Sequence, residues 1–117
     1  MGEIIETYRL ENGLILLIFD HSRRMVGDRW LVSLEARIDI DVEDEVKREI
    51  LGEKISFSYK KERNFIDKRE KDKVFSELKR NFLNSTWPYI SKKDFAKRFI
   101  ESKIREKEGG IMAWKRF

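Results

Sequence analysis

Hydrophobic and polar positions alternate along the first third of the chain in the way that predicts β-strands. Residues 3–21 contain two apolar stretches separated by Asn12-Gly13, a dipeptide that favours a tight β-hairpin turn. A two-residue loop pairs Glu11 with Leu14 and directs the odd-numbered side chains of the second strand toward the core. The opposite face of that strand then carries an additional apolar row, made up of Leu14, Leu16 and Ile18.

The clearest strand pattern covers residues 29–42, where apolar side chains occupy every even position. Strict alternation over that length indicates one buried face and one solvent-exposed face. Residues 43–52 are acidic and end in Gly52, so they form either a short helix or an acidic loop. Alternation resumes over residues 53–60, where we expect a fourth strand.

The periodicity of the second half is that of helices. An apolar stripe at 3.6-residue spacing predicts a helix over residues 67–84. Pro88 is the only proline, and we expect the helix to end before it. A sequence typical of a capping box begins at Ser91 and predicts a second helix. Two glycines at positions 109–110 are expected to end that helix.

These elements predict an α+β fold in the order β-β-β-β-α-α, with a possible short helix after the third strand. An antiparallel sheet of about four strands would have the two C-terminal helices packed on one face. The length of 117 residues suits one domain with one core. We expect that domain to cover residues 1–108, followed by an apolar and basic tail over residues 109–117.

Charge divides the chain into an acidic and a basic half. Residues 1–52 carry a net charge of −5 and residues 53–117 a net charge of +9. This asymmetry favours an acidic partner, and nucleic-acid binding through the basic helices over residues 67–107 is the alternative function. Acidic residues interleave with these cations, as is also usual for the solvent-exposed face of an ordinary helix. The cations expected to contact an anion or nucleic acid are Arg23, Arg24, Arg29, Lys79, Arg80, Lys97 and Arg98.

Few side chains suggest catalysis. The chain has no cysteine, which excludes disulfides, thiolate metal sites and a cysteine nucleophile. His21 is the only histidine, and its neighbours form no catalytic arrangement. Asp39 and Asp41 share one strand face, where carboxylates either hold Mg²⁺ or Ca²⁺ or take part in salt bridges. We expect no cofactor, and a metal- or phosphate-handling enzyme is the least favoured function.

The pattern favours a non-catalytic binding or interaction module, with a protein partner or a second copy of the chain as its partner. The longest apolar run has six residues, far below the ~20 of a membrane span. We therefore expect a soluble, cytoplasmic protein without a membrane partner. The additional apolar row and the apolar tail both require a covering surface. The interaction surface is expected to comprise Leu14, Leu16, Ile18, Trp114 and Phe117.

Overall fold

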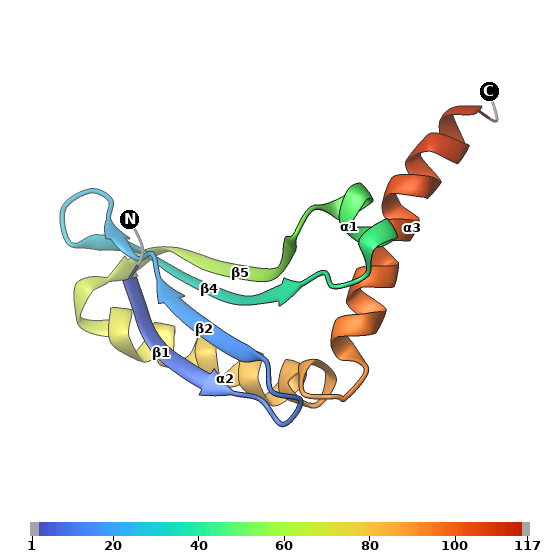
Figure 1. The fold of residues 1–117 in the computed structure, drawn as a ribbon. Helices are drawn as coiled ribbons and strands as arrows, with labels where there is room; N and C mark the ends of the chain where they lie inside the picture. The colour runs from blue at the N-terminus through green and yellow to red at the C-terminus, as the bar shows by residue number, and fades with distance from the viewer. Residues whose placement is uncertain (1–2, 116–117) are drawn as a thin grey trace.

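The structure is a computed structural model that describes the backbone of residues 3–115 and the side chains of residues 3–108. Five antiparallel strands form one sheet in this part of the chain, and two long helices follow (Figure 1). The predicted α+β fold is therefore confirmed. The elements are β1 (Glu3–Arg9), β2 (Ile15–Asp20), β3 (Arg23–Arg24), β4 (Arg29–Asp41), α1 (Glu45–Leu51), β5 (Lys54–Asp67), the 3-10 helix η1 (Lys68–Glu70), α2 (Lys71–Ile90) and α3 (Phe95–Lys115).

β4 lies at the centre of the sheet. β5 runs along one edge of β4 over its whole length, while β2 and β3 share the other edge. β1 pairs with β2 and completes the sheet on that side. Between β2 and β3 the backbone N–H of Ser22 donates to Asp20 Oδ1 at 2.8 Å, and Ser22 Oγ accepts the N–H of Ser33 at 3.0 Å. These bonds provide partners for the backbone N–H groups of Ser22 and Ser33, where the chain passes from β2 to β3.

The core lies between one face of the sheet and α2. The even-numbered side chains of β4 fill it, as the alternation predicts. The first turns of α3 add Phe95, whose ring meets Phe57 edge to face with centroids 5.5 Å apart. From there α3 leaves the sheet and passes α1 (Figure 1). The buried side chains of the two layers include Val32, Leu34, Ala36, Ile38, Leu78, Phe82 and Ile90.

The loop of the first hairpin contains three residues, 11–13, instead of the predicted two. The backbone N–H of Leu10 donates to the carbonyl of Leu14 at 2.8 Å, and that of Gly13 donates to the carbonyl of Leu10 at 2.9 Å. Gly13 has a φ of 89°, which glycine adopts without a steric penalty. This combination is a common three-residue hairpin loop with a glycine bulge.

The longer loop shifts the strand pairing by one residue, and Tyr8 lies opposite Leu16. A shift of one residue moves every side chain of a strand to the other face. Leu16 and Ile18 are fully buried in the core next to α2, and Leu14 packs against the same cluster while partly exposed. Leu16 and Ile18 are therefore not part of an accessible surface, contrary to the prediction.

Asn12 attaches this loop to the end of α2. Its side-chain amide donates to the carbonyls of Ile90 and Lys92, both at 2.8 Å. Its Oδ1 accepts the backbone N–H of Leu14 at 3.0 Å. Carbonyls at a helix C-terminus lack hydrogen-bond partners within the helix. Asn12 provides the donor for the carbonyl of Ile90, although the two residues are 78 positions apart in the sequence.

The end of α2 differs from the prediction. The helix passes through Pro88 and ends at Ile90, which is fully buried. A proline in the last turn removes one backbone hydrogen bond, while burial of the final residues stabilises the helix. Ser91 follows as the C-cap, with its N–H bonded to the carbonyl of Trp87 at 3.0 Å. It therefore ends one helix instead of opening the next.

Of the two alternatives for residues 43–52, the short helix is present, as α1. Asp44 accepts the N–H of Lys47 at its start, and Gly52 follows its end with a φ of 92°.

The remaining differences from the prediction concern the lengths of β5 and α3. β5 extends seven residues beyond residue 60, through a charged stretch without apolar alternation. α3 runs past both glycines, 109–110, to Lys115. None of the described helices is both long and apolar enough to span a membrane.

Candidate functional site

Segments that carry basic residues lie close together near the turn of the β3–β4 hairpin. β3 consists of two arginines and pairs with the start of β4. Arg29 pairs with Asp67 at the end of β5. The backbone N–H of Lys68 donates to the carbonyl of Asp28 at 2.9 Å. The β3–β4 hairpin and η1 therefore lie side by side, at the left of Figure 1.

We call this region the basic end. Its two segments, residues 23–29 and 63–70, together carry six cations and three carboxylates, a net charge of +3. All six cationic residues are exposed. Of these six, only Arg29 and Arg69 take part in ion pairs among the described side chains. The six cations of the basic end are Arg23, Arg24, Arg29, Arg63, Lys68 and Arg69.

Asp67 contacts two arginines of the basic end, Arg29 and Arg69. Its Oδ1 accepts the backbone N–H of Arg69 at 2.8 Å and lies 3.3 Å from Nε of the same residue. Its Oδ2 lies 3.8 Å from Nη1 of Arg29. The backbone and guanidinium hydrogen bonds from Arg69 lower the pKa of Asp67. The ionised carboxylate thus holds two guanidinium groups near one point.

Phe65 is unusual in both conformation and exposure. With a φ of 57°, it is the one non-glycine residue in the described part of the chain with a positive φ. It lies in a β-bulge of β5 opposite the register shift between Trp30 and Val32. Its side chain is 63% exposed, and a left-handed backbone costs a non-glycine residue about 1–2 kcal/mol. The basic end therefore presents an exposed aromatic ring on a strained backbone, and backbone strain of this kind clusters at functional sites.

A polar cleft of about 240 Å³ lies between β1, the end of β2 and α2. Two lysines in it are already paired, Lys71 with Asp72 at 3.2 Å and Lys79 with Glu6. The hydrogen bond from Lys79, followed by that from Tyr8, lowers the pKa of Glu6. The bond to Glu6 also raises the pKa of Tyr8 to about 12. The charges of this cleft are therefore largely compensated.

The other predicted anion contacts do not join the basic end. Lys79 is held by Glu6, and Arg80 is exposed farther along α2. Lys97 and Arg98 belong to the first turn of α3, where Arg98 Nε lies 2.6 Å from Asp94 Oδ2. The structure thus brings Arg23, Arg24 and Arg29 together but does not unite the seven predicted cations. Trp114 and Phe117 of the predicted interaction surface lie outside the described side chains.

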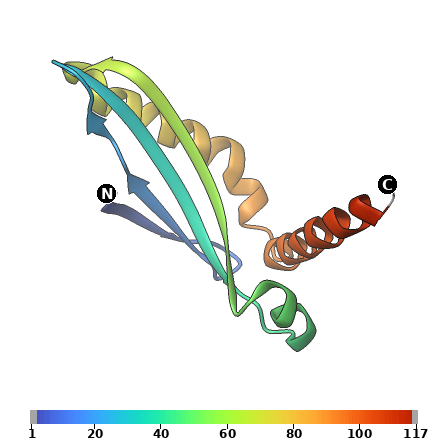
Figure 2. The same ribbon diagram turned by 90° about the horizontal axis from the view of Figure 1, so that it is seen from above.

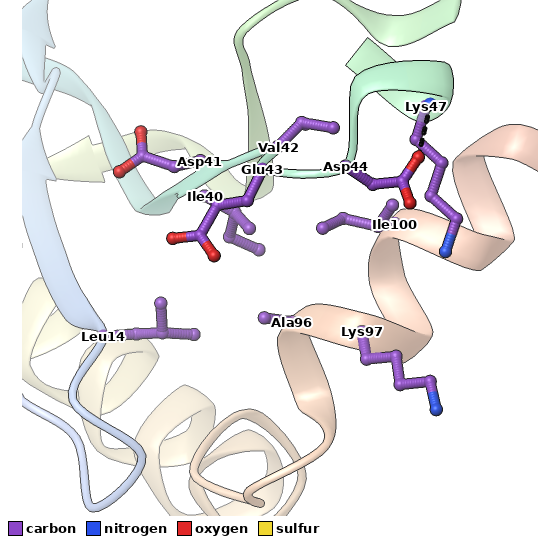
Figure 3. Close-up of a pocket in the computed structure, with 10 residues that line it drawn as sticks. All are labelled: Leu14, Ile40, Asp41, Val42, Glu43, Asp44, Lys47, Ala96, Lys97 and Ile100. Atoms are coloured by element: carbon purple, nitrogen blue, oxygen red, sulfur yellow. Dashed lines mark hydrogen bonds between the residues drawn. The ribbon is translucent and has the colours of Figure 1, made fainter.

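A second cavity, of about 410 Å³, lies between the end of β4, α1 and the first turns of α3 (Figure 3). Apolar side chains form its floor, and Glu43 points toward its centre. The residues that line it include no hydroxyl, thiol or imidazole, so it offers no serine, cysteine or histidine nucleophile. Its lining residues are Leu14, Ile40, Asp41, Val42, Glu43, Asp44, Lys47, Ala96, Lys97 and Ile100.

His21 lies at the outer face of the sheet, the face turned away from α2. Its Nε2 is 2.6 Å from Glu35 Oε1, and Ser58 Oγ donates to Glu35 Oε2 at 3.0 Å. The imidazole stacks on Phe19 with ring centroids 5.7 Å apart. Burial raises the pKa of Glu35, but the hydrogen bonds from His21 and Ser58 together bring it below its ordinary value of 4.5. The arrangement links three strands and leaves both carboxylate oxygens occupied.

Asp39 and Asp41 are also engaged by neighbouring side chains. Ser56 Oγ donates to Asp39 Oδ1 at 2.6 Å, and Arg37 Nε lies 3.4 Å from the same oxygen. Lys54 Nζ lies 3.8 Å from Asp41 Oδ1. Nowhere in residues 3–108 do three histidine, aspartate or glutamate side chains gather as a metal site would require.

Replacing Glu35 with glutamine is expected to lower the free energy of unfolding by about 1 kcal/mol at neutral pH, the usual contribution of such hydrogen bonds. A lowered folded-state pKa stabilises the protein fully above the ordinary pKa of 4.5, and this contribution is lost as the pH falls through the folded value. Urea unfolding of both proteins at neutral pH and at about pH 3 checks this. A stability difference that is equal at both pH values would contradict it.

Comparison of the chain with protein-family models, with curated proteins and with solved structures finds no match. The basic end and the faces and edges of the sheet therefore carry the functional evidence.

Proposed function

We propose that this chain is a non-catalytic binding module that holds single-stranded nucleic acid at the basic end. The observation that carries the proposal is the exposed ring of Phe65, held at a positive φ in the same end of the sheet as six exposed cations. Guanidinium groups bind phosphate oxygens in a bidentate fashion, and aromatic rings stack on bases. We assign this function to the cytoplasm, because a chain without cysteine suits a reducing compartment.

Stacking favours a single strand over a duplex. The faces of bases in a duplex are covered by their neighbours, whereas those of a single strand are free to stack on Phe65. Four cations of the basic end take no part in ion pairs among the described side chains, so phosphate contacts need not displace a carboxylate. These four are Arg23, Arg24, Arg63 and Lys68.

Fluorescence anisotropy with labelled oligonucleotides of ~16 nucleotides tests the proposal. The single strand should bind more tightly than the duplex, and its affinity should fall as salt rises from ~50 to ~200 mM. The triple variant Arg23→Ala, Arg24→Ala, Lys68→Ala should bind more weakly. Its slope of log affinity against log salt should be about 2 units less negative, because each lost phosphate contact on a single strand contributes about 0.7.

The matched control removes the same charge from the other end of the molecule, with Lys92→Ala, Lys93→Ala and Lys97→Ala. All three side chains are exposed, and they lie in the α2–α3 loop and at the start of α3. This variant should bind like the parent protein. Equal losses in both triple variants would contradict a localised site. Absence of binding at low salt, including the case in which anionic vesicles bind instead, would rule the function out.

A further inference from the structure

The cavity between the end of β4, α1 and the first turns of α3 lies at the end of the sheet opposite the basic end (Figure 2). β4 begins beside β3 and ends at this cavity, so the length of the strand separates the two regions. The cavity volume of about 410 Å³ falls within the ~300–1,000 Å³ typical of small-molecule sites. Binding of nucleic acid at the basic end makes no use of this cavity.

The floor of the cavity keeps apolar surface accessible. Ile40 is almost fully buried beneath it, whereas Leu14, Ala96 and Ile100 are only partly buried. A ligand that covers these three side chains removes apolar surface from water, which is favourable in proportion to the area covered. The floor therefore fits the apolar part of a ligand.

Glu43 supplies the polar contact. Its carboxylate points toward the centre of the cavity (Figure 3) and takes part in no ion pair or hydrogen bond among the described side chains. The neighbouring acids are already engaged. Asp41 Oδ1 lies 3.8 Å from Lys54 Nζ, and Asp44 Oδ1 accepts the backbone N–H of Lys47 at 3.0 Å. Glu43 is therefore the carboxylate that a ligand can reach.

Hydrogen bonds hold the segment that carries Glu43 in place. The backbone N–H of Val42 donates to the carbonyl of Glu53 at 2.9 Å, and Nε of Arg48 donates to the carbonyl of Val42 at 3.0 Å. On the other side of the cavity, α3 contacts α1. These contacts form the walls before a ligand binds, and such preorganisation lowers the cost of binding.

The charges around Glu43 favour a cation. Residues 41–45 carry four carboxylates and no basic residue. Lys47 of α1 and Lys97 of α3 lie on the side of the cavity away from Glu43 (Figure 3). An ammonium group beside Glu43 gains a charge-assisted hydrogen bond, whereas a ligand carboxylate at the same place is repelled.

We infer that this cavity binds a small amphiphilic amine. The apolar body of the amine lies against Leu14, Ala96 and Ile100, and its ammonium group donates to the carboxylate of Glu43. The site is independent of the basic end, because it takes a ligand of the opposite charge.

NMR titration of nitrogen-15-labelled protein tests the inference with four probes: hexylammonium, hexan-1-ol, hexanoate and methylammonium. Hexylammonium should bind with a dissociation constant on the order of 1 mM, as expected of so small a ligand in an open cavity. It should shift the backbone amides of residues 40–45 and 96–100. Hexan-1-ol should shift the same amides at higher concentration. Methylammonium lacks the apolar body and hexanoate lacks the cation, so neither should approach saturation below ~20 mM.

Three variants separate the carboxylate from the floor. Glu43→Gln should weaken hexylammonium binding by about 10-fold, to the level of hexan-1-ol, and leave hexan-1-ol unaffected. The matched control Glu49→Gln removes the same charge from an exposed position of α1 outside the cavity, and should bind like the parent protein. Ala96→Leu fills the cavity with a larger side chain and should abolish binding of both hexyl probes.

Absence of saturable shifts at the cavity with hexylammonium would overturn the inference, as would shifts confined to other residues. Hexanoate that binds as tightly as hexylammonium, or equal losses in the two glutamine variants, would also contradict it. The ligand-free spectrum of each variant reports its fold. Glu43 is exposed, so Glu43→Gln should fold and decide the result even if Ala96→Leu does not fold.

Discussion

Replacement of Ile18 by alanine is expected to lower the free energy of unfolding by about 2–5 kcal/mol, the range for truncating a large buried aliphatic side chain. Ile18 has no exposed surface and lies in the core cluster that also contains Leu78 and Phe82 of α2. The matched variant Ile15→Ala changes the same residue type in the same strand. Its expected cost is below about 1 kcal/mol, because Ile15 is 41% exposed on the outer face.

Urea unfolding followed by tryptophan fluorescence gives both values under identical conditions. The comparison reads the hairpin register directly, because the two possible registers bury opposite rows of β2. A larger loss for Ile15→Ala than for Ile18→Ala would indicate the two-residue loop and would place Leu16 and Ile18 outward. Similar losses for both would mean that β2 is covered on both faces.

The register illustrates how far a single sequence leads. The Asn12-Gly13 dipeptide correctly locates the turn, and the alternation in β4 correctly identifies its buried face. Neither determines the length of the loop, which differs by one residue between two common hairpins. In the three-residue loop the amide of Asn12 contacts the end of α2, far away in sequence. Local patterns do not contain that tertiary contact, and the loop length to which it belongs sets which row of β2 is buried.

The candidate site was accessible to sequence reasoning only in part. The arginines at positions 23, 24 and 29 already suggest an anion contact next to a glycine-containing loop. The cations of residues 63–69 join them because β5 continues to Asp67, through a charged stretch with no apolar alternation. The hydrogen bonds of that stretch come from pairing with the start of β4, which is a tertiary property. The positive φ of Phe65 has no sequence signature, because phenylalanine occupies a bulge position that is usually marked by glycine.

Phe65→Gly is expected to separate stability from binding. Glycine relieves the left-handed strain of about 1–2 kcal/mol but loses about 0.5–1 kcal/mol through the greater freedom of the unfolded chain. The free energy of unfolding should therefore stay the same or rise by up to about 1.5 kcal/mol. Loss of one stacked base should weaken single-strand binding by about 1–3 kcal/mol, or roughly 5- to 140-fold. Urea unfolding and fluorescence anisotropy measure the two effects.

The conservative variant Phe65→Tyr keeps the ring and should bind like the parent protein. The salt dependence distinguishes stacking from charge, because Phe65→Gly removes no cation and should leave the slope of log affinity against log salt unchanged. The triple variant of Arg23, Arg24 and Lys68 should change that slope. A Phe65→Gly protein that binds as tightly as the parent would show that the ring does not stack. A large loss of stability in the same variant would assign Phe65 to folding, and the strain at its backbone would then need no ligand to explain it.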